Sequence, residues 1–137
     1  MSIPTREAAF LATTYRVETP GECFDLRIGQ CHPAFDDFLR RQGVSCWGIL
    51  TASNPGALPL SAAENLQRQA QLLARLDVLG WPSFAGCNVA DDGDWPVEAS
   101  RLILQIGEED LRTLAREFAQ LAGVYGRIGA APALLWL

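Results

Sequence analysis

The sequence predicts an α+β fold in which three to four helices pack on one mixed β-sheet of about five or six strands. Two observations predict it. Short segments with the alternation or the continuous apolar character of strands are interspersed with segments of helical periodicity, and their order is neither a strict strand–helix repeat nor all strand. The chain of 137 residues also contains no internal repeat, low-complexity segment or linker. We therefore expect a single globular domain spanning residues 1–137.

The first part of the chain is predicted to hold two helices and a strand. A short helix over about Thr5–Thr13 leads into Tyr15-Arg16-Val17. Cys23–Ile28 alternates between apolar and polar residues, which is typical of a half-buried strand. Pro33 fits the first turn of a second helix, which we expect to end at Gly43.

The middle of the chain predicts a buried strand followed by the longest helix. Val44–Leu50 is a nearly continuous apolar run that is too short for a helix, so we interpret it as a central strand covered on both faces. Ser61 and Glu64 have the spacing of a capping box, and Gly80 supplies a stop signal. The buried stripe of this helix is expected to consist of Leu66, Ala70, Leu73, Leu76 and Leu79.

The last part of the chain adds strands around one more helix. The helix begins near the acidic Glu108-Glu109-Asp110, where the macrodipole favours negative charge, and Gly123 is expected to end it. Strands are predicted over Ser83–Val89, Ser100–Ile106, Val124–Ile128 and Ala133–Leu137.

Composition and charge exclude several classes of function. All 11 basic residues are arginine, so Schiff-base, P-loop and general-base lysines are impossible. With a net charge of −5 and no basic cluster, the chain is not expected to bind nucleic acid broadly. No apolar run approaches the roughly 20 residues of a membrane span. Because Arg6 and Glu7 precede any apolar stretch, the start does not resemble a signal peptide, and we expect a cytoplasmic protein.

The cysteines do not form a recognisable metal or redox motif. None of them belongs to a Cys-x-x-Cys pair, which excludes the spacing of structural zinc sites and of thioredoxin-like motifs. We expect them to be buried thiols. They are Cys23, Cys31, Cys46 and Cys87.

An ordered set of short motifs resembles the bacterial domain-of-unknown-function 3293 family. The motifs are Tyr15-Arg16-Val17, Ile28-Gly29-Gln30, His32-Pro33-Ala34-Phe35-Asp36, Thr51-Ala52-x-Asn54-Pro55, Glu64-Asn65, Trp95-Pro96-x-Glu98-x-Ser100 and Phe118-x-Gln120. They follow one another over nearly the whole chain. The resemblance implies a small stand-alone bacterial domain and brings no biochemical activity, cofactor or substrate with it.

The loop after the predicted central strand is the first candidate for a binding site. Ligands of open α/β sheets tend to lie beyond the carboxyl ends of strands, where Thr51 and Asn54 are expected. Asn54 would bond a base or amide edge of a ligand, and Thr51 or Ser53 a phosphate or carboxylate. Alternatively, Asn54-Pro55 only starts a turn by bonding its own backbone.

Four further residues are candidates for chemistry or binding. His32 is the only histidine, and at a helix start it would act as a base, a donor or merely a cap. Glu98 follows Trp95-Pro96 and is expected to open a strand, and a partly buried carboxylate there would have a raised pKa suited to a general acid or base. Gln30 precedes His32. Gln120, expected on the last helix among apolar neighbours, needs partners from the backbone or from a ligand.

The acidic loop is not expected to bind a metal. Asp91, Asp92 and Asp94 lack the regular spacing and the terminal glutamate of an EF-hand, which favours a solvated acidic turn.

Two functions therefore remain open. In the first, Gln30, His32, Thr51, Asn54, Glu98 and Gln120 converge on one pocket of a small-molecule or nucleotide-binding protein, with hydrolase or transferase activity. His32 or Glu98 would then move the proton. In the second, the chain is a non-catalytic interaction or regulatory module, which forms a homodimer through its apolar C-terminal strand, Ala133–Leu137. Convergence of the six polar residues would favour the first, and an exposed Leu135–Leu137 patch the second.

Overall fold

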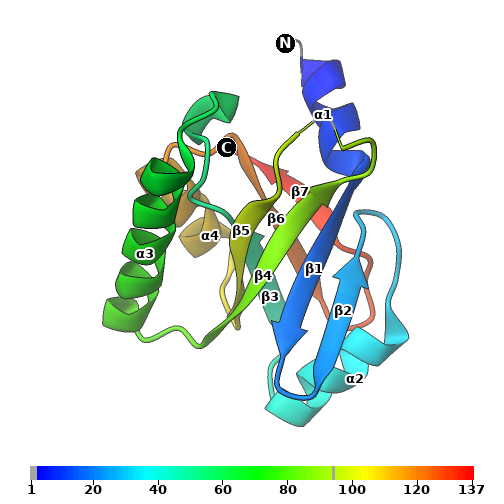
Figure 1. The fold of residues 1–137 in the computed structure, drawn as a ribbon. Coiled ribbons are helices and arrows are strands. Elements are labelled where there is room, and N and C mark those ends of the chain that lie inside the picture. Colours follow the sequence, from blue (N-terminus) through cyan, green and yellow to red (C-terminus); the bar gives the residue numbers. More distant parts are fainter. Residues whose placement is uncertain (1–2, 94) are drawn as a thin grey trace.

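The computed structural model describes residues 3–93 and 95–137, and over these it has an α+β fold. Four α-helices and one 3₁₀ turn accompany seven strands, all of which belong to one sheet (Figure 1). The elements are α1 (Ile3–Leu11), β1 (Thr13–Thr19), β2 (Glu22–Leu26), α2 (Pro33–Gln42), β3 (Cys46–Leu50), η1 (Pro55–Ala57), α3 (Ala62–Leu79), β4 (Ser83–Ala90), β5 (Glu98–Leu104), α4 (Glu108–Glu117), β6 (Ala122–Arg127) and β7 (Ala133–Trp136).

The sheet corrects two details of the predicted fold. Its strand order is β2-β1-β4-β5-β3-β6-β7, and every neighbouring pair is antiparallel, so the sheet is not mixed. The additional strand is β1, which the sequence marked only as Tyr15-Arg16-Val17 after a helix. A single residue, Ala12, separates α1 from β1, and no turn signal marks the boundary.

The sheet is antiparallel because strands from distant parts of the sequence lie between the strands that the helices connect. The helical crossovers α2 and α3 suggest parallel pairs, because a parallel neighbour requires a crossover connection. Here the connected strands are not neighbours: β1, β4 and β5 lie between β2 and β3, which α2 connects, and β5 lies between β3 and β4, which α3 connects. Pairing between strands so distant in sequence leaves no local pattern from which it could be predicted.

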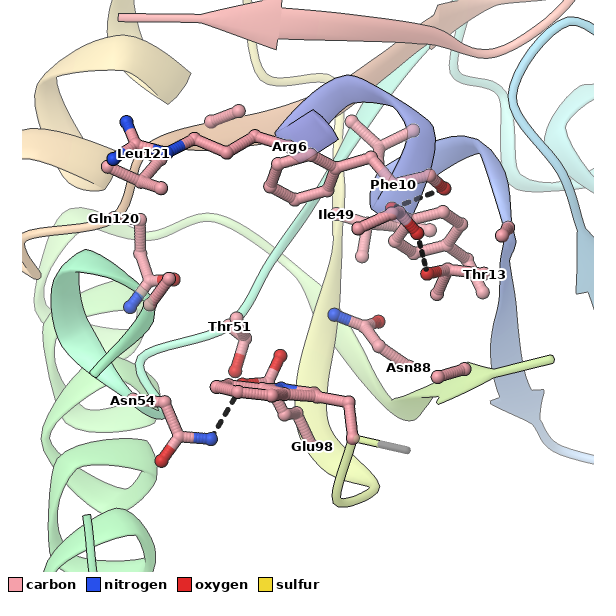
Figure 2. Close-up of a pocket in the computed structure, with 18 of the residues that line it drawn as sticks. Arg6, Phe10, Thr13, Ile49, Thr51, Asn54, Asn88, Glu98, Gln120 and Leu121 are labelled. Atoms are coloured by element: carbon pink, nitrogen blue, oxygen red, sulfur yellow. Dashed lines mark hydrogen bonds between the residues drawn. The ribbon is translucent and has the colours of Figure 1, made fainter. Parts of the chain in front are cut away.

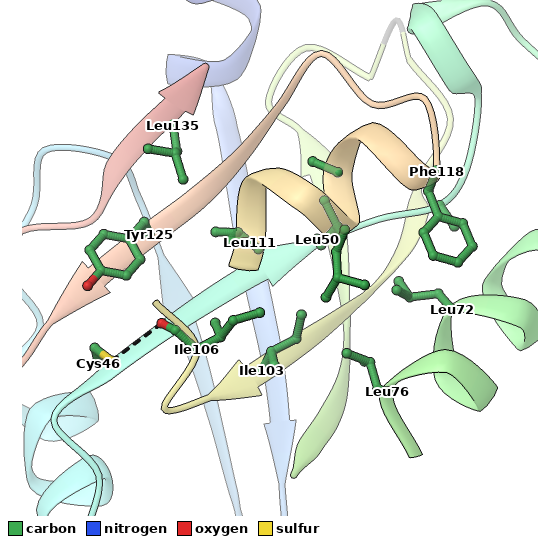
Figure 3. Packing of buried hydrophobic residues seen from close by; sticks show 13 residues of the cluster. Cys46, Leu50, Leu72, Leu76, Ile103, Ile106, Leu111, Phe118, Tyr125 and Leu135 are labelled. Carbon is green, nitrogen blue, oxygen red and sulfur yellow. Dashed lines mark hydrogen bonds between the residues drawn. The ribbon is translucent and has the colours of Figure 1, made fainter. Parts of the chain in front are cut away.

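One face of the sheet packs against α3 and α4. Alternate residues of the central strands, such as Leu50 and Ile103, are fully buried there beneath Leu72 of α3 and Leu111 of α4 (Figure 3). At Gly48 of β3 an added Cβ would lie 2.8 Å from a methyl group of Leu111, so only glycine allows α4 this close approach.

The opposite face packs against α2 at one end. Phe35, Phe38 and Leu39 of α2 are buried against Trp47 of β3 and its neighbours. The Phe35 and Trp47 rings meet edge to face, with centroids 5.2 Å apart. Because both faces are covered around β3, all five of its residues are buried, which confirms the interpretation of this segment as a central strand.

Helix α3 does not bury the stripe that its periodicity suggested. Its capping box between Ser61 and Glu64 is present as predicted. Leu76 is buried, but Leu66 is 75% exposed, and the buried partner of Leu76 is Leu72. Ala70, Leu73 and Leu79 are exposed as well. The face turned toward the sheet carries the polar Asn65, Arg68 and Gln69, which bond the loop after β3 and thereby set the rotation of the helix.

The C-terminal strand and the cysteines differ from expectation in part. Leu135 of β7 is buried and Trp136 contacts the ring of Phe10 at 5.5 Å, so only Leu137 of the expected apolar patch is exposed. Of the thiols, Cys46 is buried and Cys87 half-buried. The other two, Cys23 and Cys31, are exposed, because they lie on the uncovered face of β2 and in a loop.

Helix α1 stands at the end of the sheet opposite α2 (Figure 1). The Tyr15 hydroxyl donates to the Phe10 carbonyl at 3.3 Å, and Arg27 donates to the Leu11 carbonyl at 3.2 Å, which connects the helix to β1 and to the end of β2. No helix in the described part of the chain is both long and apolar enough to cross a membrane.

The contact between Gly126 and Trp47 offers a test of the packing. An added Cβ at Gly126 would lie 2.3 Å from the buried Trp47 ring, which has no room to move. We expect Gly126→Ala to lower the free energy of unfolding by about 1–3 kcal/mol in a urea titration. Gly107→Ala is the matched control, because open space surrounds Gly107, and its effect should stay below about 1 kcal/mol, the cost of losing the glycine at the N-cap of α4. Equal stability of the two variants would contradict this packing.

Candidate functional site

A cavity of about 320 Å³ lies at the α1 end of the sheet. We call it the sheet-end pocket (Figure 2). It is bounded by α1, by the face of the sheet that α2 covers at its other end, and by the loops after β3, β4 and α4. Its lining residues are Arg6, Ala9, Phe10, Ala12, Thr13, Tyr15, Ile49, Thr51, Asn54, Ala57, Asn88, Ala90, Asp92, Trp95, Glu98, Gln120, Leu121, Ala122, Gly123 and Val124. Most of the wall is apolar, which is usual for a small-molecule site.

Four of the six residues singled out from the sequence meet in this pocket. They are Thr51, Asn54, Glu98 and Gln120, and they come from the loop after β3, the first residue of β5 and the loop after α4. Figure 2 shows Asn54, Thr51 and Glu98 close together, with Gln120 on the same side of the pocket. The expected gathering beyond the carboxyl end of β3 is therefore present for these four residues.

The loop after β3 is held by hydrogen bonds from the polar face of α3. The backbone N–H of Ala52 donates to Gln69, and the Ala52 carbonyl accepts from Arg68 at 2.6 Å. The backbone N–H of Asn54 donates to the Asn65 side chain at 2.8 Å. These bonds satisfy a buried irregular segment that could not otherwise leave water without cost.

Asn54 connects this loop to Glu98. Its backbone lies in the left-handed region, with φ 49° and ψ 61°, which asparagine tolerates better than most residues. The side-chain oxygen accepts from Leu60 N at 2.9 Å and from Asn65 Nδ2 at 2.7 Å. The side-chain nitrogen donates to Glu98 Oε2 at 2.7 Å. The oxygen of Asn54 is therefore fully used, one N–H of its side-chain nitrogen holds Glu98 in position, and the second N–H has no hydrogen bond to the described residues.

Glu98 is the titratable group that the pocket presents most directly. It opens β5 as predicted, and burial raises the pKa of its carboxyl above the ordinary value, partly offset by hydrogen bonds from Asn54 and Trp95. The Trp95 Nε1–Oε2 distance is 3.1 Å. Both donors bond the same oxygen, and Oε1 has no hydrogen bond to the described residues. A fixed carboxylate with one free oxygen is suited to accept a proton or an N–H from a ligand.

Thr51 and Gln120 contribute to the wall through bonds of their own. The Thr51 hydroxyl donates to the Ala99 carbonyl at 2.7 Å and accepts from Ser53 N. Gln120 donates through Nε2 to the carbonyls of Ser53 and Phe118, at 3.0 and 3.3 Å. Gln120 therefore finds its partners in the backbone, as one of the two alternatives expected. It lies in the loop after α4, however, and not on the last helix.

Helix α4 ends earlier than predicted, which explains the place of Gln120. The helix stops at Glu117, Ala119 adopts a positive φ of 55°, and Gly123 lies inside β6 instead of ending the helix. Gly56 N bonds the Ala119 carbonyl at 2.7 Å, so the loops after β3 and α4 are joined directly. Phe118 closes the apolar face as the cap residue.

The floor and roof of the pocket add residues that the sequence did not suggest. Asn88 of β4 pairs with Glu98 of β5 in the sheet register, and its buried Oδ1 has no hydrogen-bond partner within residues 3–93 and 95–137. Arg6 of α1 also has a buried Nε that no described residue accepts a hydrogen bond from. The sequence could have suggested Asn88, because a side-chain amide inside a predicted strand needs a hydrogen-bond partner. For Arg6 no local signal exists, because α1 reaches the pocket only through tertiary contacts.

His32 and Gln30 lie outside the pocket. His32 caps α2: its Nδ1 accepts from Phe35 N at 3.2 Å, and its ring packs edge to face on Phe24. Gln30 is exposed in the loop before it. Both follow β2, whereas the strands that line the pocket are β1, β3, β4, β5 and β6. A position close to a strand end therefore does not by itself place a residue in the pocket.

The acidic loop is divided among different roles. Asp91 forms a bidentate ion pair with Arg27, at 2.7 and 2.9 Å, and this pairing lowers the pKa of Asp91. Asp92 lines the pocket, and Asp94 lies outside the described residues. Over residues 3–93 and 95–137 no three histidine, cysteine, aspartate or glutamate side chains are grouped so that they could hold a metal.

Comparison with known proteins yields one match. A family model described as Protein of unknown function (DUF3293) matches residues 50–122. No curated protein and no solved structure matches the chain significantly. The matched segment runs from the end of β3 to the start of β6 and includes all four predicted residues that line the pocket.

The raised pKa of Glu98 predicts a gain in stability on its neutralisation. A carboxyl whose pKa is higher in the folded than in the unfolded chain makes the folded protein bind more protons between those two values, so its contribution weakens as the pH rises through them. We expect Glu98→Gln, whose amide oxygen still accepts from Asn54 and Trp95, to be more stable than the wild type at neutral pH. In urea titrations this difference should grow with pH from about 4.3, the ordinary glutamate pKa, and then level off.

The control is Glu22→Gln, at an exposed glutamate paired with Arg41. It should show no such gain. A Glu98→Gln variant that is less stable than the wild type at neutral pH would mean that the pocket stabilises the charge of Glu98.

Proposed function

Because the chain belongs to the DUF3293 family, whose description names no activity, we propose its function from the pocket: it binds a small molecule, with Glu98 as the group that accepts a proton or a hydrogen bond from it. The observation that carries the proposal is the arrangement of Glu98. One oxygen of this half-buried carboxylate is held by two donors, and the other has no partner among the described residues at a cavity of about 320 Å³.

The size and lining of the cavity support a small ligand. Its volume lies near the lower end of the range for small-molecule sites. The walls include Phe10, Tyr15 and Trp95, which offer flat apolar surfaces. Most of the polar lining groups gather around Glu98, whereas Arg6 reaches in from α1. Such a division favours a ligand with an apolar body and a polar end.

The chemistry available to this site is proton transfer. A raised pKa brings the Glu98 carboxyl closer to neutrality, where a general acid or base is most effective. Burial also raises the pKa of Tyr15, which keeps its phenol neutral. A hydrolase or transferase in which Glu98 activates the attacking group is the enzymatic form of this proposal.

The alternative is an interaction module that pairs through β7. This strand is at one edge of the sheet, and Leu137 beside it is 43% exposed. Two facts favour the pocket instead: β7 has only four residues, and its Leu135 and Trp136 already pack within the chain. Light scattering across a range of protein concentrations tests the dimer directly.

A ligand screen by thermal shift tests the proposed function. The panel comprises amines, amino acids, nucleosides, nucleotides and sugar phosphates. A ligand at a hundred times its dissociation constant should add about 2.7 kcal/mol of stability, a shift of several degrees. We expect a hit that Glu98→Gln weakens by about tenfold or more, since a hydrogen bond to a charged group contributes about 1.5–3 kcal/mol.

Gln30→Ala serves as the control, because Gln30 is exposed and outside the pocket, and it should leave the affinity unchanged. Hits that respond to neither variant would place binding elsewhere, and a concentration-dependent dimer without any hit would favour the interaction module.

A further inference from the structure

Arg6 is a cation at the edge of the sheet-end pocket that has no partner among the described residues. Its side chain is half-buried, its Nε is fully buried, and it makes no hydrogen bond or ion pair with any described residue. A buried N–H of a charged group that has lost water without gaining an acceptor is costly. An anion in the pocket would supply that acceptor.

The opposite end of the pocket offers acceptors. Figure 2 shows Arg6 reaching from α1 toward Leu121, far from the end where Glu98 and Asn54 meet. There the free Oε1 of Glu98 is beside Asn88, its cross-strand neighbour, whose amide also has no hydrogen bond to the described residues. An ammonium group, with three donors, suits a carboxylate and an amide oxygen side by side.

The charges of the lining limit the ligand further. Among the described lining residues Arg6 is the only cation, and Asp92 and Glu98 are the anions. A dianionic phosphate would meet one positive charge and two negative ones, whereas a single carboxylate matches one guanidinium in a bidentate pair. The wall between the two ends is apolar and includes Phe10 and Ile49, so it favours a ligand with an apolar body.

Resting on the proposed function, we infer that the ligand is a small zwitterion whose carboxylate pairs with Arg6 and whose ammonium group pairs with Glu98 across an apolar body. A carboxylate and an amine on the same carbon are too close together to reach both ends. The substrate class is therefore an amino acid with its charged groups separated by a ring or chain, rather than an α-amino acid or a nucleotide.

Three matched probes test the inference by isothermal titration calorimetry on the full chain. They are 4-(aminomethyl)benzoate, with both charges, 4-methylbenzylamine, with the amine alone, and 4-methylbenzoate, with the acid alone; phenylalanine is the α-amino acid comparison. We expect the first to bind about tenfold or more tightly than the others. Arg6→Gln should abolish its advantage over the amine, and Glu98→Gln its advantage over the acid.

The control variants are Arg75→Gln and Glu22→Gln, which alter exposed ion pairs on other parts of the surface and should leave all affinities unchanged. If the amine binds the wild type as tightly as the zwitterion, or if phenylalanine binds more tightly, the inference is wrong although the proposed function stands. If no probe binds while a screening hit depends on Glu98, the inference again fails alone. If no probe binds and no screening hit depends on Glu98, both fail.

Discussion

The hydrogen bond from Asn54 to Glu98 joins the two halves of the site, and the rest of the pocket depends on it. Asn54 adopts a left-handed backbone, and each polar group of its side chain is bonded within the protein. The bond to Glu98 fixes the carboxylate in one orientation, so that its second oxygen faces the cavity. Preorganisation of this kind removes the entropy that a mobile carboxylate would lose on binding.

The same constraint determines how α3 packs. The helix turns Asn65, Arg68 and Gln69 toward the loop after β3, and apolar residues such as Leu66 are left on its exposed side. A helix selected for burial alone would be rotated the other way. Support of the loop has therefore been obtained at the expense of hydrophobic burial, which is common where structure serves a site.

Local patterns predicted the fold class, the capping box of α3, the buried strand β3 and the position of Glu98 at a strand start. These features depend on residues close together in sequence. The antiparallel order, the extra strand β1 and the role of Arg6 could not be predicted, because they depend on pairing between distant segments. The placement of His32 failed for a related reason: a histidine before a helix has the same local pattern whether it caps the helix, as here, or faces a ligand. Four of the six polar candidates meet because the end of β3, the start of β5 and the loop after α4 lie at the same end of the sheet.

The distribution of unsatisfied groups argues that the pocket is a site and not a packing defect. Around Thr51, Asn54 and Gln120 the buried polar groups that hold the loops are bonded to partners at ordinary distances. In the described part of the chain three residues have a buried side-chain atom without a partner, and two of them, Arg6 and Asn88, line this pocket. A poorly packed region would leave such groups scattered. Here they line one cavity together with the free oxygen of Glu98. Arg6 is a hydrogen-bond donor at one end of this cavity, and the oxygens of Asn88 and Glu98 are acceptors at the other. Such groups cost free energy in the empty protein, because they are buried without hydrogen bonds. A binding site requires groups of this kind that are together complementary to one ligand.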